Sequence, residues 1–174
     1  PELAELYDVL TPLEFLKLMG ELYNMEQKVA EERAIKMLTA FDLGNNLHSR
    51  MDTFSKGMRQ KVLLTSGLLH NPEIIILDEP LSGLDANSVI IVKDLITKLA
   101  REGKTIFYCS HMMDIVEKVS DRIILINNGT IVADGSFDDL KQNMGDTSLE
   151  KIFANLTAKE ELSTAADQLL NALD

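Results

Sequence analysis

The chain has 174 residues, which is enough for one domain with a substantial core. Its formal net charge of −11 argues against a nucleic-acid-binding surface, so no nucleic acid is expected among its partners. The single cysteine excludes an internal disulfide, and no stretch approaches the length of a transmembrane helix, so any membrane role is expected to come through a partner.

The first part of the chain predicts three helices. Residues 11–14, Thr-Pro-Leu-Glu, are typical of a helix start, and this helix is expected to run to about Gly20. A second helix is expected from about residue 28 to residue 41, and a third just after Gly57. The third helix is expected to point three apolar side chains inward: Val62, Leu63 and Leu69.

Residues 74–85 carry the strongest signal in the chain and read Ile-Ile-Ile-Leu-Asp-Glu-Pro-Leu-Ser-Gly-Leu-Asp. The apolar run is too short for a typical helix, so it predicts a fully buried parallel strand that ends at the acids Asp78 and Glu79. Burying two acids is costly unless a cation or polar ligand compensates. Phosphate chemistry with Mg²⁺ uses such a pair, one carboxylate for the metal and one for the attacking water. The alternative is a core strand that runs into an ordinary surface turn.

The middle of the chain predicts a second strand parallel to the first. A helix is expected over about residues 86–101, and Thr105–Cys109 reads as another buried strand, with Cys109 as a small buried residue. Strand, helix and strand in this order form the unit of a parallel sheet with a right-handed crossover. The helix is expected to bury one apolar face: Val92, Leu95, Ile96 and Leu99.

The last part predicts a hairpin and short helices. Residues 122–133 read as two strands joined at Asn127-Asn128-Gly129, whose Asn-Gly pair supplies positive φ angles. Helix starts are expected at residues 136–139 and 147–150, and a last amphipathic helix is expected from Thr157 onward.

Four ordered motifs resemble those of the ATP-binding-cassette (ABC) ATPases, and the resemblance covers nearly the whole chain. Residues 54–58 resemble the signature loop, usually Leu-Ser-Gly-Gly-Gln, and residues 74–79 resemble the Walker B strand with its following glutamate. Residues 82–85 resemble the D-loop, and His111 resembles the switch histidine. The resemblance implies an α/β fold: a P-loop NTPase-like parallel sheet core with a helical subdomain and a C-terminal β-hairpin plus helices.

The resemblance also implies a single partial ABC ATPase domain over residues 1–174. Its parts would be a helical subdomain at about 10–70, catalytic core strands at about 71–135 and C-terminal helices at about 136–174. No Gly-x-x-x-x-Gly-Lys-Ser/Thr phosphate loop (Walker A) occurs in the sequence, although the family places one before the signature. We therefore expect the N-terminal part of the domain to be missing by truncation, and the chain alone to be inactive. Alignment at the start puts Glu2 where the family has a glutamine that contacts the metal and the transporter.

The resemblance assigns roles around bound ATP and Mg²⁺. Asp78 would contact the metal, usually through water, and Glu79 would act as the general base. His111 would hold the γ-phosphate and the attacking water in place.

Another group of residues is expected at a dimer interface. Ser55 and Gly57 precede a helix, and the start of a helix is an anion site. The family uses this site for the nucleotide of a second subunit. The resemblance therefore implies a head-to-tail homo- or heterodimer, in which Lys56 adds positive charge near the phosphates. Asp85 is expected either to cross the same interface or to cap the following helix.

The leading hypothesis for function is the ATPase subunit of a membrane transporter, of the branch that exports drugs, antibiotics or ions. The forms of residues 54–60 and 148–153 resemble that branch. Such a subunit is cytoplasmic and peripheral on the inner face of the cell membrane, where it binds an integral membrane partner. The alternatives are an ABC ATPase of translation or DNA repair, and a non-catalytic interaction fragment.

Overall fold

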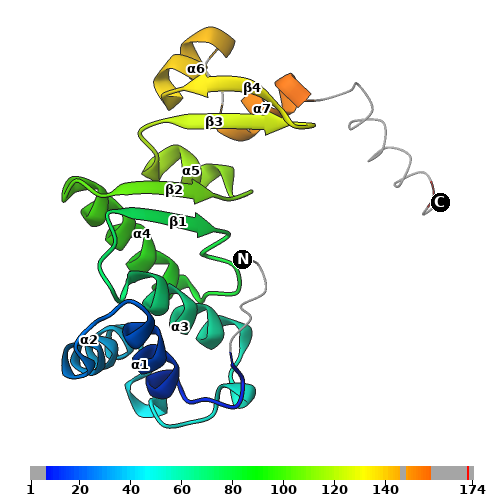
Figure 1. Ribbon diagram of the computed structural model, residues 1–174. Coiled ribbons are helices and arrows are strands. Elements are labelled where there is room, and N and C mark those ends of the chain that lie inside the picture. Colours follow the sequence, from blue (N-terminus) through cyan, green and yellow to red (C-terminus); the bar gives the residue numbers. More distant parts are fainter. Residues whose placement is uncertain (1–6, 146–147, 158–171, 173–174) are drawn as a thin grey trace. The chain divides into compact units, whose positions relative to one another are not determined.

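The computed structural model describes residues 7–145, 148–157 and 172. The chain divides into two compact units, Pro1–Ser110 and His111–Asp174. The described part of the first unit holds helices and a parallel sheet, and that of the second holds a hairpin with short helices (Figure 1). The predicted α/β class is confirmed, while the expected three-part division of the domain stays a prediction. None of the helices in the described ranges is both long and apolar enough to cross a membrane.

The first unit begins with the three predicted helices. They are α1 (Pro12–Leu22), α2 (Gln27–Ala40) and α3 (Lys56–Leu68), with short 3₁₀ turns η1 (Gly44–Asn46) and η2 (Met51–Thr53) between the last two. The predicted helix start is confirmed by a capping box, in which the Thr11 hydroxyl accepts from the Glu14 N–H and the Glu14 carboxylate accepts from the Thr11 N–H. This box fixes the start of α1, which runs slightly beyond the expected Gly20.

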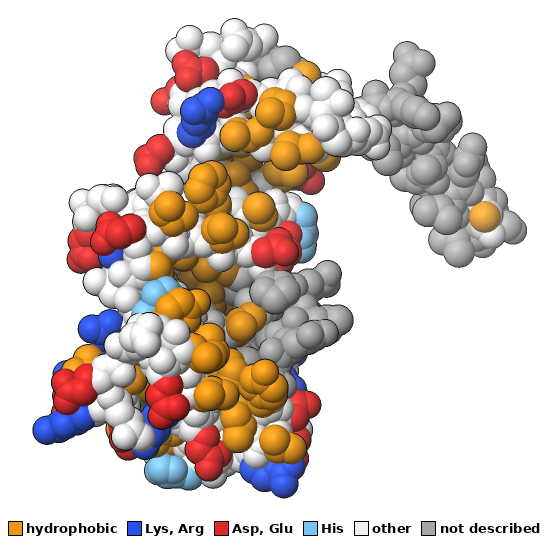
Figure 2. Space-filling model, in the orientation of Figure 1, with side chains coloured by type: hydrophobic (Ala, Val, Ile, Leu, Met, Phe, Trp, Pro, Cys, Tyr) orange, Lys and Arg blue, Asp and Glu red, His pale blue; other side chains and the backbone are white. Residues whose placement is uncertain are grey.

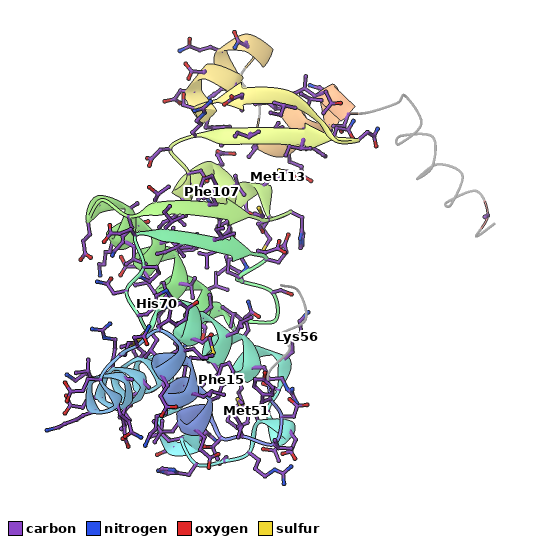
Figure 3. All side chains as sticks on the ribbon, viewed as in Figure 1. Phe15, Met51, Lys56, His70, Phe107 and Met113 are labelled. Carbon is purple, nitrogen blue, oxygen red and sulfur yellow. The ribbon has the colours of Figure 1, made fainter. Side chains whose placement is uncertain are left out.

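These helices enclose an apolar core in which Phe15 and Met51 are labelled in Figure 3. Val62 and Leu69 point inward as predicted, but Leu63 is only half-buried. The reason is the helical spacing, which places Val62, Thr65 and Leu69 on the buried face of α3. The buried members of the core are Leu13, Phe15, Leu16, Ala34, Leu38, Leu43, Met51, Phe54, Val62 and Leu69.

The parallel sheet of the first unit has two strands, β1 (Ile74–Asp78) and β2 (Thr105–Cys109). They pair in parallel, as predicted, with Ile74 opposite Thr105 and Asp78 opposite Cys109. The connecting helix α4 (Ala86–Arg101) lies along one face of the strands in Figure 1. Its predicted apolar face and the sheet line one narrow apolar space together: Val92, Leu95, Ile96 and Leu99 from the helix, and Ile75, Leu77 and Ile106 from the strands.

The prediction that both strands are fully buried is wrong for this structure. Ile76 is 74% exposed, Ile74 and Phe107 are also exposed, and Cys109 is exposed rather than buried. Side chains alternate between the two faces of a strand, and α4 covers only the face that carries Ile75. The opposite face gathers hydrophobic side chains at the surface (Figure 2).

The second unit contains α5 (Met113–Val119), β3 (Ile123–Asn127), β4 (Thr130–Gly135), α6 (Phe137–Met144) and α7 (Leu149–Thr157). The strands form the predicted antiparallel hairpin, whose turn residues Asn128 and Gly129 have φ angles of 49° and 76°. The predicted helix start at Ser136 is confirmed by a second capping box with Asp139. The helix expected after Thr157 lies almost wholly outside the described residues.

Candidate functional site

Two acids stand at the carboxyl end of β1. Asp78 is the last residue of the strand and is exposed, so its carboxylate is accessible to a cation. Among the described residues, no three His, Cys, Asp or Glu side chains gather as a metal site. A single open carboxylate suits Mg²⁺, which protein sites commonly hold through one or two carboxylates together with water and substrate phosphates. The residues present therefore fit a nucleotide-bound Mg²⁺ better than a metal caged by protein ligands alone.

Glu79 is fixed at the point where both strands of the sheet end. Its φ angle is +46°, a left-handed conformation that residues with a side chain seldom adopt. Its N–H donates to the Cys109 carbonyl at 3.0 Å, and its carboxylate accepts from the Ser110 hydroxyl at 3.1 Å. These contacts fix the half-buried Glu79 directly after the exposed Asp78.

The start of α3 carries the predicted signature residues. The helix begins at Lys56 rather than just after Gly57, because Ser55 acts as its N-cap and accepts from the Met58 N–H at 3.2 Å. Ser55 and Lys56 are exposed, and no acidic side chain lies in the first turn. Free N–H groups at a helix start, with a lysine and without an acid, are suited to an anion.

The signature residues also contact the D-loop of the same chain. A Cβ atom on Gly57 would lie 2.5 Å from the Gly83 carbonyl oxygen, so only glycine fits at position 57 without a shift of the backbone. The aliphatic stem of Lys56 lies against Gly83, and Figure 3 shows Lys56 at the beginning of α3. The structure thus brings together two motifs that lie well apart in the sequence.

Asp85 caps α4, which is one of the two roles expected for it. Its carboxylate accepts from the Ser88 N–H at 3.0 Å and from the Ser88 hydroxyl at 2.7 Å, and it pairs with Lys61 at 2.9 Å. The hydrogen bonds from Ser88 are the main cause that holds the pKa of Asp85 well below its ordinary value, and Lys61 adds to the effect. Its contact across a dimer interface stays a prediction.

The placement of two predicted site residues at this group, Glu2 and His111, stays a prediction. Glu2 lies outside the described residues. His111 is the first residue of the second unit, where it is exposed and its carbonyl accepts from the Met113 N–H at 3.0 Å. Its role at the γ-phosphate stays a prediction.

Three residues that contact the site or the turn after Glu79 were missed by the sequence analysis: Gln60, which donates to the Pro80 carbonyl, Lys61 and Ser110. Gln60 precedes the buried Leu64 by four positions, so helical spacing could have placed it on the buried face of α3. Ser110 reaches Glu79 because Asp78 pairs with Cys109 in the sheet. That register depends on tertiary pairing, so the sequence carried no local signal for it.

Comparisons of the sequence with a family model and with known proteins agree on one family. The sequence model of the family described as "ABC transporter" matches residues 6–82. The chain is 36% identical over 148 residues to the ABC transporter ATP-binding protein NatA of Bacillus subtilis, covering 85% of the chain and 60% of NatA. It is 34% identical to the linearmycin resistance ATP-binding protein LnrL of Bacillus subtilis, covering 83% of the chain and 47% of LnrL. It is 32% identical to the doxorubicin resistance ATP-binding protein DrrA of Mycobacterium tuberculosis, covering 94% of the chain and 49% of DrrA.

A solved structure agrees with these sequence matches. It is described as the structure of the ATP-binding subunit of an ABC transporter and superposes with a TM-score of 0.84 at 31% identity. The match covers 91% of this chain and 67% of that structure, whereas the chain spans only 47–60% of the three relatives named above. The fold, the order of the motifs and these matches agree: the chain belongs to the ABC transporter family of ATP-binding proteins.

Proposed function

We propose that this chain belongs to an ATP-hydrolysing subunit that powers a membrane transporter of the exporter type. The observation that carries the proposal is the pair of acids at the end of β1, where Asp78 is accessible and Glu79 is held by Ser110. Two relatives are named for resistance to linearmycin and doxorubicin, which favours export as the direction of transport.

The two acids divide the work of hydrolysis between them. Bound MgATP would supply the phosphoryl group and the cation that neutralises its charge. Asp78 would hold the metal ion through its open carboxylate, directly or through water. Glu79 would accept the proton of the attacking water, because a carboxylate fixed by a hydrogen bond keeps the direction that a general base requires.

The start of α3 would serve the nucleotide of a second subunit. Ser55, Lys56 and Gly57 offer exposed or half-buried N–H groups and one positive charge, and they contact the D-loop of their own chain at Gly83. A head-to-tail dimer would bring this helix start to the partner's phosphates. His111 would contact the γ-phosphate, and Asp85 would contact the dimer interface. The dimer would bind an integral membrane subunit at the inner face of the cell membrane.

The substitution Glu79→Gln tests the proposal. It is made in a version of the protein that carries a phosphate loop ahead of residue 1, and ATP hydrolysis and ATP binding are both measured. A glutamine keeps the shape but cannot take a proton, so hydrolysis should fall by about 10²–10⁴ while binding stays nearly intact.

The matched control is Glu73→Gln, the same chemical change at an exposed glutamate directly before β1 that pairs with Lys104. This variant should hydrolyse ATP at the parent rate. If the Glu79→Gln variant keeps more than about half of the parent rate, Glu79 is not the general base.

A further inference from the structure

The amide of Gln60 makes a buried contact between α3 and the turn that follows Glu79. Gln60 is 3% exposed, and its Nε2 donates to the Pro80 carbonyl at 3.1 Å. The other buried polar residues of α3, Thr65 and Ser66, bond to carbonyls of their own helix. The Gln60 side chain therefore satisfies a carbonyl twenty positions away, and a buried carbonyl without a partner would be costly.

The turn that Gln60 contacts begins at the proposed general base. Glu79 has its left-handed φ angle there, and its carbonyl accepts from the Ser82 N–H at 3.1 Å. A strained backbone of this kind persists only where the surroundings determine it, and such strain clusters at functional sites. Pro80 directly follows Glu79 and is among the fully buried side chains, so a shift of Pro80 would move the Glu79 carboxylate.

Two further contacts tie the same helix to the same turn. Gly57 lies against the Gly83 carbonyl, and Lys61 pairs with Asp85 through a lysine side chain that is only 11% exposed. Gln60 lies between Gly57 and Lys61 in α3, and it is buried whereas both of those residues are only half-buried. Together these contacts join α3, the helix that begins with the signature residues and is called the signature helix below, to the turn that begins at Glu79.

We propose that Gln60 is a positioning residue for Glu79, which holds the turn at Pro80 and so couples the position of the signature helix to the direction of the general base. This inference rests on the proposed function, because Glu79 must be the base for its direction to matter. It adds a residue that neither the motif comparison nor the relatives assign to the reaction.

The test compares Gln60→Met with Thr65→Val. Methionine keeps the length of the side chain but has no hydrogen-bond donor, and Thr65→Val removes a buried hydroxyl that bonds within its own helix. In the version that carries a phosphate loop, Gln60→Met should lower kcat for ATP by about tenfold or more and leave KM within about twofold. Thr65→Val should leave both constants within about twofold of the parent.

A double variant separates positioning from a general loss of structure. If Gln60 acts through Glu79, adding Gln60→Met to Glu79→Gln should slow hydrolysis no further, because residues that act as a unit are not additive. Three results would overturn the proposal. They are a double variant whose rate loss is the product of the two single losses, an unchanged kcat in Gln60→Met, and an equal loss of kcat in Thr65→Val.

Hydrogen exchange distinguishes this inference from the proposed function. In the 174-residue chain without nucleotide, the amides of Ser82 and Leu84 should exchange faster in Gln60→Met than in Thr65→Val. If exchange is faster in Gln60→Met but the parent version with a phosphate loop does not hydrolyse ATP, the proposed function is rejected. The contact of Gln60 would then still be shown to stabilise the turn. Unchanged exchange together with an active parent would reject the role of Gln60.

Discussion

The hydroxyl of Ser110 donates to the carboxylate of Glu79 at 3.1 Å, from the residue that directly follows the neighbouring parallel strand. The bond adds to the backbone contact between the Glu79 N–H and the Cys109 carbonyl at 3.0 Å. The side chain and the backbone of Glu79 are thus both held by the end of β2. This arrangement fixes a carboxylate whose own backbone is strained.

Loss of the Ser110 hydroxyl should weaken hydrolysis without weakening ATP binding. A hydrogen bond to a charged group is worth roughly 1.5–3 kcal/mol, so Ser110→Ala should lower kcat by about tenfold or more. Ser110→Thr is the matched control, because it keeps the hydroxyl. Steady-state kinetics check the prediction, and equal rates for the alanine and threonine variants would contradict it.

The chain alone should bind MgATP weakly or not at all. Asp78 and Glu79 are present, but the 174 residues contain no Gly-x-x-x-x-Gly-Lys-Ser/Thr loop to surround the phosphates with N–H groups. Calorimetric titration of the chain with MgATP measures the affinity directly. A micromolar Kd that is lost in Asp78→Asn would show that the site at β1 binds nucleotide without such a loop.

Much of the fold could be predicted from local sequence signals. The helix starts at Thr11 and Ser136 and the Asn128-Gly129 turn depend on residues close together in the chain, and the structure confirms them. The exposed face of the sheet could not be predicted this way. Ile74, Ile76 and Phe107 read as core residues because the apolar run alone does not say which of its faces another element covers.

The residues of the candidate site also fall into those that local sequence signals predict and those that tertiary packing brings together. Asp78 and Glu79 are predicted because they end an apolar strand, and Ser55 because its loop resembles the family signature and precedes a helix. Gln60 and Ser110 were missed because their partners, the Pro80 carbonyl and the Glu79 carboxylate, are brought near by tertiary packing.

Asp85 should make the stability of the chain depend on pH. Its folded-state pKa is lowered, so the unfolded chain binds its proton more readily, and the stabilisation is present above about pH 4 and is lost as the pH falls towards the folded pKa. Asp85→Asn can still cap α4 but carries no charge for Lys61. The Tm of the parent should therefore exceed that of Asp85→Asn at pH 7, and the difference should shrink in acid.

Two comparisons make this pH prediction specific. In a Lys61→Met background the difference in Tm at pH 7 should be smaller, because the ion pair is one cause of the lowered pKa. A difference in Tm that stays constant from neutral to acid pH would show that Asp85 contributes only as an uncharged cap.

The signature residues should act on the nucleotide of the other subunit. The test uses a mixed dimer in the version that carries a phosphate loop, with Ser55→Arg in one subunit and a disabled phosphate loop in the other. If Ser55 acts in trans, both defects fall on one composite site and the second site stays intact. If Ser55 acts in cis, each subunit has one damaged site.

Activity and occupancy together decide between these arrangements. With independent sites, the trans arrangement should retain about half of the parent activity, whereas dimers that carry either defect in both subunits should be inactive. Strict coupling between sites would lower the activity of the mixed dimer as well, so ATP occupancy is measured for each site. One filled and one empty site supports action in trans, because only a helix start that reaches the partner's phosphates can spare one site completely. Two equally depleted sites would contradict the head-to-tail dimer and would leave the contacts of Lys56 and Gly57 with Gly83 as interactions within a single chain.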